Sequence, residues 1–189
     1  MASNPISVRI LPGCRGAISA PELRRVARAV FHAEGVQRQV EVTLALADAD
    51  TVHELNRLHR GHDEPTDVLS YGVTPAEPEW AADAGAPENE VDPRPSTIAL
   101  VEPPAFIDAP GAAPYLGDVV VCLPLARDQA VVARGSVAGS VAHLAVHGLL
   151  HLLAYDHEEA AGSAAMQSRE DELLSALGYA GQYAHGHLD

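Results

Sequence analysis

Lysine is absent from this chain of 189 residues, and its 12 basic residues are all arginines. The 26 acidic residues outnumber them, so the formal net charge is −14. General nucleic-acid binders cluster cations against the phosphates, so this composition argues against that class of protein. If RNA is nevertheless the ligand, its phosphates must meet a local arginine patch, a metal ion or a partner protein.

Cysteine, aromatic residues and long apolar runs are also scarce. Cys14 and Cys122 are too few for a disulfide scaffold, and we expect both to be reduced. Aromatic residues make up only 4% of the chain, so the core should be aliphatic. No segment is long and apolar enough to cross a membrane, and residues 1–13 lack the apolar stretch of a signal peptide. We therefore expect a cytoplasmic protein without a membrane partner.

The hydrophobic pattern predicts an α+β fold, in which a mixed sheet of about four strands is packed with helices. The expected strands are Ile6–Leu11, Gln39–Leu46, Thr66–Val73 and Leu116–Leu123. The expected helices are Ala20–Ala33 after a capping box at Ser19, a short one capped by Asp48 or Asp50, Pro124–Ala133, Val137–Leu153 and Met166–Leu177. A chain of this length suits one domain over residues 1–189, with about 70% of its surface buried on folding.

Three histidines in an apolar segment are spaced at positions zero, four and ten: His147, His151 and His157. Residues four apart in a helix lie on one face, so His147 and His151 can direct their imidazoles at one ion. His157 is too far along the same helix, and the chain must turn near residues 154–156 to bring it back. Three nitrogen ligands leave a fourth position for water, which is the layout of a catalytic zinc site. We therefore predict one Zn2+ per chain.

His143 is a competing ligand, because it precedes His147 by four residues. It would stand about 12 Å from His151 along the helix axis, at roughly 1.5 Å per residue. Three ligands at that spacing on one straight helix converge poorly, so we expect His143 to pack beside the site or to support a ligand. The alternative for the whole segment is a buried helix whose histidines are satisfied by hydrogen bonds alone.

The same histidine spacing occurs in metzincin proteases, which carry the motif H-E-x-x-H-x-x-G-x-x-H. Two positions depart from that motif: Gly148 stands where the protease has its general-base glutamate, and Ala154 where it has the turn glycine. Without the glutamate, no evident group takes the proton from the attacking water in peptide hydrolysis. The pattern retains the ligand geometry of the proteases without their chemistry.

The run from His147 to His157 resembles the signature H-G-x-L-H-L-x-G-Y-D-H of the YbeY family of bacterial rRNA-maturation endoribonucleases. The one departure is Ala154 in place of glycine, which costs stability if that residue has a positive φ. Residues 55–71 are similar to the family's L-N-x-x-[FY]-R and P-T-D-V-L-S-F, and residues 116–121 to its L-G-D-[IV]-x-[IV]. The resemblance covers most of the chain in three motifs, which stand in the family's order.

The arginine of the second motif is functional in this family, and the match places that role at Arg60. A guanidinium near a zinc ion can clamp a phosphate through two parallel hydrogen bonds. From the residues alone, the favoured alternative is a surface salt bridge from Arg60 to Asp63 or Glu64. In the third motif, Asp118 is either a turn residue or a partner of a ligand histidine.

Residues at about 74–115 are rich in proline and acid, with Arg94 as their only basic residue. Such a segment buries little apolar surface, and the family usually has a shorter connection here, so we interpret it as an insertion. Residues 98–101 could add a short strand within it. The insertion also holds much of the excess negative charge, which leaves the predicted catalytic core closer to neutral.

The resemblance implies a zinc-dependent endoribonuclease, specific for single strands, that matures the 3′ end of 16S rRNA and serves ribosome quality control. Its partners would be ribosomal RNA, the ribosome and ribosome-associated proteins. Asp156 and Glu158 are the adjacent candidates for the catalytic base, and the nucleophile is either water or the ribose 2′-hydroxyl. Two alternatives remain open: a metallohydrolase of small or peptide substrates, and a non-catalytic ribosome-associated protein with structural zinc.

Overall fold

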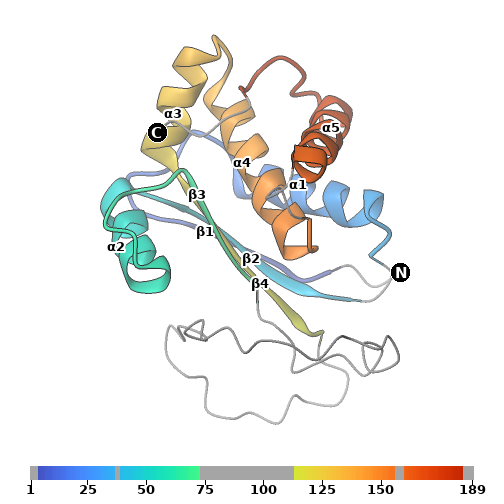
Figure 1. Cartoon of the computed structure of the whole chain (residues 1–189), viewed down its shortest axis with the longest axis horizontal. Helices are drawn as coiled ribbons and strands as arrows, with labels where there is room; N and C mark the ends of the chain where they lie inside the picture. Colours follow the sequence, from blue (N-terminus) through green and yellow to red (C-terminus); the bar gives the residue numbers. More distant parts are fainter. Residues whose placement is uncertain (1–3, 37–38, 73–112, 156–159, 185–189) are drawn as a thin grey trace.

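The computed structural model describes residues 4–36, 39–72, 113–155 and 160–184, and these form a mixed α/β arrangement (Figure 1). The elements in chain order are β1 (Ile6–Ile10), α1 (Ala20–Ala33), β2 (Glu41–Ala47), α2 (Ala49–Arg60), β3 (Val68–Gly72), β4 (Tyr115–Cys122), α3 (Leu123–Val132), α4 (Val137–Leu152) and α5 (Ala160–Ala176). The predicted α+β fold with a mixed four-stranded sheet is therefore confirmed. The predicted insertion, including the strand considered at residues 98–101, lies almost wholly outside the described residues.

The four strands form one sheet in the order β1-β2-β4-β3. Strands β1, β2 and β4 run parallel to one another, whereas β3 pairs antiparallel with β4 and lies at an edge of the described sheet. Strand β4 is largely buried, and its run of valines is typical of a central strand that is covered on both faces.

The two faces of the sheet are covered by different helices (Figure 1). On one face, Val119 and Val121 of β4 join Leu44 and Leu46 of β2 in the main core with α1, α4 and α5. On the other face, a smaller cluster contains Val120 and Cys122 of β4, Leu69 of β3 and Val52 of α2. Because neighbouring residues of a strand point to opposite faces, α2 and α4 lie on opposite sides of the sheet.

Helix α4 runs through the main core, which explains its apolar sequence. Ser136 caps its first turn by accepting a hydrogen bond from the backbone nitrogen of Gly139 at 3.0 Å. Every residue from Gly139 to Val146 is buried, and so are Gly148, Leu149 and Leu150. None of the described helices is long and apolar enough to cross a membrane.

The predicted element bounds are close to the observed ones, with one larger difference at α5. That helix begins at Ala160, six residues before the predicted Met166. Residues 160–165 contain only alanine, glycine and serine, so no large apolar side chain marks this first turn and a half. Strand β3 begins at Val68 rather than Thr66, and just before it the Asp67 side chain accepts a hydrogen bond from the Val68 nitrogen at 2.8 Å.

Candidate metal centre

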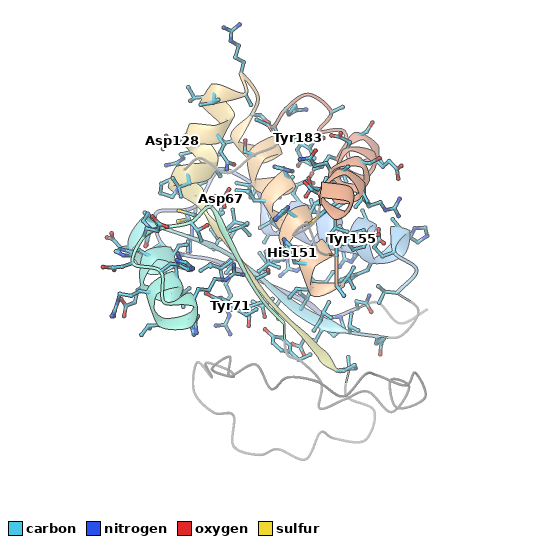
Figure 2. All side chains as sticks on the ribbon, viewed as in Figure 1. Asp67, Tyr71, Asp128, His151, Tyr155 and Tyr183 are labelled. Carbon is cyan, nitrogen blue, oxygen red and sulfur yellow. The ribbon has the colours of Figure 1, made fainter. Side chains whose placement is uncertain are left out.

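Helix α4 presents three histidines on one face, four residues apart: His143, His147 and His151. The Nε2 atoms of His147 and His151 lie 3.0 Å apart, with their rings nearly perpendicular. His147 keeps 15% of its side chain exposed, whereas His143 is deeper and keeps 6%. The side chains of His147 and His151 therefore converge, as predicted. His151 lies near the C-terminal end of α4 (Figure 2).

The outer nitrogen of each ring is held by an oxygen acceptor. His147 Nδ1 lies 2.7 Å from Oε1 of Glu170 in α5, and His151 Nδ1 lies 3.0 Å from the backbone oxygen of Tyr155. A carbonyl oxygen and an ionised carboxylate only accept hydrogen bonds, so both Nδ1 atoms carry their protons. In the neutral rings, the two Nε2 lone pairs then face each other at 3.0 Å. A proton or a metal ion between the two nitrogens would satisfy both lone pairs.

The spacing of these two nitrogens fits zinc. Two nitrogens on one tetrahedral zinc stand about 3.3 Å apart, given Zn–N distances of about 2.0–2.1 Å. The observed 3.0 Å is close to this value. The third predicted ligand, His157, lies outside the described residues. Accordingly, the described part of the chain contains no group of three candidate ligands.

The turn after α4 supplies the acceptor for His151. Ala154 has a φ of 68°, in the left-handed region, which is the condition under which alanine costs stability in place of the signature's glycine. The Tyr155 nitrogen donates to the Leu150 oxygen at 3.0 Å and the Ala154 nitrogen to the His151 oxygen at 3.0 Å. This bonding pattern is a Schellman motif, and it brings the Tyr155 carbonyl under the His151 ring. The Tyr155 hydroxyl donates in turn to Glu34 at the end of α1.

Gly148 lies against the sheet at the position where metzincins carry their glutamate. A Cβ atom at Gly148 would stand 2.5 Å from Cγ1 and 3.2 Å from Cγ2 of Val119 in β4. Val119 is fully buried, and its β-branched side chain has little rotational freedom. The missing glutamate thus has a packing reason, since the helix approaches the strand too closely for any side chain at this position.

Glu170 is the functional candidate that the sequence analysis missed. It is 2% exposed and lies on the inward stripe of α5, between Met166 and the pair Leu173 and Leu174. Burial alone would raise the pKa of Glu170, but the hydrogen bonds from His143 and His147 outweigh it and lower the pKa to about 2. A charged residue on an otherwise apolar helical stripe is the signal that could have revealed it.

His143 lies beside the pair, as expected. Its Nε2 is 3.2 Å from Oε2 of Glu170, and its ring stacks on Tyr183 with centroids 4.8 Å apart. The second oxygen of Glu170 is therefore held by His143, while the first holds His147.

Arg60 is exposed at the end of α2, on the opposite face of the sheet from α4. Among the described residues it forms no ion pair with Asp63 or Glu64, so the salt-bridge interpretation is wrong. Asp63 instead pairs with His53 at 2.9 Å. The charge of Arg60 acts on Tyr71 of β3, where burial raises the pKa to about 12 and Arg60 opposes that rise.

Asp118 is neither a turn residue nor a partner of the ligand histidines in the described structure. It lies inside β4 and alternates with Val119, so its side chain points to the α2 face. There Asp118 Oδ1 accepts a hydrogen bond from the Tyr115 hydroxyl at 2.7 Å. The predicted bases Asp156 and Glu158 lie outside the described residues.

Comparisons with known proteins point in one direction. A family model described as Endoribonuclease YbeY matches residues 16–178. A relative from Moorella thermoacetica, named Endoribonuclease YbeY, is 40% identical over 156 residues, which cover 82% of this chain and 85% of the relative. A relative of the same name from Dehalococcoides mccartyi is 33% identical over 172 residues, which cover 91% of this chain and 96% of the relative.

One solved structure is also similar. The solution structure of TM1509 from Thermotoga maritima aligns with a TM-score of 0.50 and covers 90% of both chains. At 18% sequence identity this likeness concerns the fold alone.

Proposed function

This chain belongs to the YbeY family of endoribonucleases, and we propose that it is a zinc-dependent enzyme that cleaves single-stranded RNA during the maturation of ribosomal RNA. Its substrate would be the 3′ region of 16S rRNA, and its work would include ribosome quality control. The ribosome and ribosome-associated proteins are then its partners.

One observation carries the metal dependence: two imidazole Nε2 atoms face each other at 3.0 Å, and both outer nitrogens are held by acceptors. We assign His147 and His151 as two ligands and His157 as the third, with one Zn2+ per chain. Zinc supplies a Lewis acid that can polarise a phosphate oxygen or activate water. The chain's own contribution is to orient both rings, because each Nδ1 atom lies against an oxygen acceptor.

Arg60 is the proposed phosphate-binding residue. Its guanidinium is exposed and makes no ion pair within the described residues, so it can offer two parallel hydrogen bonds to a phosphate. Asp156 and Glu158 flank His157, and we propose one of them as the proton acceptor. The nucleophile is water or the ribose 2′-hydroxyl.

The packing of Gly148 disfavours the alternative of a peptide hydrolase. With a prospective Cβ 2.5 Å from Val119, the position cannot hold the glutamate that metzincins use as their base. A metallohydrolase of small substrates stays open as well, and a ribosome-associated protein with structural zinc predicts zinc binding without RNA cleavage.

Zinc content and cleavage of a single-stranded RNA oligonucleotide, measured on the same preparations, test the proposal. With zinc in excess, His151→Ala should lose most of its zinc and its cleavage activity, whereas His143→Ala, which removes no proposed ligand, should keep its zinc content near wild type. Equal zinc losses from the two variants would mean that the ligands are wrongly assigned. Zinc binding without cleavage in the wild type would favour the structural alternative.

A charge-conserving substitution tests Arg60. Arg60→Lys keeps the charge but loses the planar fork, so cleavage should fall about tenfold or more while folding and zinc content remain unchanged. Full activity in this variant would remove Arg60 from the site.

A further inference from the structure

The buried carboxylate of Glu170 joins two histidines of the neighbouring helix. Oε1 lies 2.7 Å from Nδ1 of His147, and Oε2 lies 3.2 Å from Nε2 of His143. The Glu170 side chain is only 3% exposed, so these contacts are made away from bulk water. A buried carboxylate is tolerated only when it is paired, and here both of these partners belong to the face of α4 that carries the metal candidates.

The contact with His147 determines which nitrogen of that ring is available. An ionised carboxylate accepts but does not donate, so it selects the form of His147 with the proton on Nδ1. The lone pair then lies on Nε2, which is the atom that faces His151 at 3.0 Å. Without this acceptor, the neutral ring could place its proton on Nε2 instead, and that nitrogen could no longer bind a metal.

The contact with His143 fixes the carboxylate itself. The His143 ring is stacked against Tyr183, with an interplanar angle of 23°, and Tyr183 donates a hydrogen bond to Asp171 of α5. Tyr183, which follows α5 in the chain, thus packs against the face of the His143 ring. Both oxygens of Glu170 are therefore oriented, and the plane of the carboxylate is set before any ligand arrives.

We propose that Glu170 is a positioning residue of the metal centre: it holds His147 in the Nδ1-protonated form and orients its ring, and His143 and Tyr183 orient Glu170. This inference rests on the proposed metal function. Removing a carboxylate that orients a ligand histidine lowers metal affinity by about 10–100-fold. A purely structural role, in which Glu170 only ties α5 to α4, would change stability and leave metal affinity and tautomer unchanged.

The test compares Glu170→Ala with Glu170→Gln and with the control Glu172→Ala. Glu172 lies on the same helix, is exposed and pairs with Arg169, so its loss leaves the histidines untouched. Zinc affinity is measured by chelator competition, and the tautomer of His147 by 15N NMR of the metal-free protein. We expect Glu170→Ala to lose about 10–100-fold in affinity and to populate Nε2-protonated His147. Glu170→Gln, which retains an acceptor oxygen, should lose less, and Glu172→Ala should match wild type.

The proposal is overturned if folded Glu170→Ala, or folded Glu170→Gln where the alanine variant does not fold, keeps both wild-type zinc affinity and the wild-type tautomer. Failure of the proposed function gives a different result, which is seen in the wild-type protein itself: it would bind no zinc, or bind zinc without cleaving RNA. The tautomer measurement still decides the role of Glu170 in that case, because it is made without metal.

Discussion

Gly148 offers the sharpest test of how α4 is held against the sheet. In Gly148→Ala, the new methyl group would stand 2.5 Å from Cγ1 of Val119, a side chain with no exposed surface in the central strand β4. Overpacking of this kind costs about 1–3 kcal/mol. Replacing a helical glycine by alanine returns up to about 1 kcal/mol. The net loss should therefore be about 1–2 kcal/mol, equivalent to a fall in Tm of roughly 2–8 °C for a domain of this size.

A double-mutant cycle with Val119→Ala identifies the cause of that loss. Val119→Ala alone should destabilise the protein, because it leaves a cavity beside α4. In the double variant, the methyl group introduced by Gly148→Ala occupies part of the space that the valine vacates. The combined loss should therefore be smaller than the sum of the two single losses, with a coupling of about 1 kcal/mol or more. Urea unfolding followed by circular dichroism gives all four free energies.

Gly72→Ala serves as the control, because a Cβ atom there would meet Leu152 Cδ2 at an ordinary 3.7 Å. Its stability should stay within about 0.5 kcal/mol of wild type. Wild-type stability in Gly148→Ala, or simple additivity with Val119→Ala, would refute the reasoning. The packing explanation for the missing protease glutamate would fall with it.

Three further outcomes are expected. Ala154→Gly should raise the free energy of unfolding by about 0.5–1 kcal/mol, because an L-residue with positive φ costs about 1–2 kcal/mol and the higher unfolded-state entropy of glycine offsets part of the gain. Arg134 has a φ of 52°, so Arg134→Gly should have a similar effect. Urea unfolding that shows no gain in either variant would contradict this reasoning. In metal-free protein, the contribution of Glu170 to the free energy of unfolding should be present above pH about 4.5 and be lost as the pH falls toward 2, because its pKa is lowered from 4.5 to about 2. A shift of this size is worth roughly 3 kcal/mol. Wild type should therefore lose its stability advantage over Glu170→Gln between these two pH values, and a pH-independent difference would argue against this role. Replacing residues 76–112 with a short Gly/Ser linker should leave Tm within a few degrees, because the flanking strands are paired neighbours and long surface insertions cost little to close; a collapse in the thermal melt would show that the segment belongs to the core.

The parts of the fold that could be predicted are those encoded in local sequence. Alternating apolar residues indicated β1 and β2, and a continuous apolar run indicated β4. The four-residue spacing of His147 and His151 placed both on one face of α4. The first turns of α5 were missed because alanine, glycine and serine carry no hydrophobic periodicity. The side of the sheet to which Asp118 points was predictable from its alternation with Val119, but that step was not taken.

The rest of the site depends on contacts between residues far apart in the chain. Glu170 and His147 are separated by 23 positions in the sequence, and only the packing of α5 on α4 brings them together. Val119 excludes a side chain at Gly148 through a contact between a strand and a helix. A sequence motif shows which residue stands at each position of α4. The reason for that residue lies in the helix or strand that packs against it, which the motif does not contain.

The position of Arg60 sets a geometrical condition on the substrate. Helix α2, which ends at Arg60 before the left-handed Gly61, packs on one face of the sheet, and the histidines of α4 lie on the other. Between them stands β3, a five-residue strand at the edge of the described sheet. A ligand that touches both Arg60 and the histidine nitrogens must therefore pass around this edge. A double helix resists so sharp a bend within a few base pairs, since the persistence length of duplex DNA is about 150 bp. A single strand can follow the path, so this arrangement supports a single-stranded substrate for the proposed enzyme.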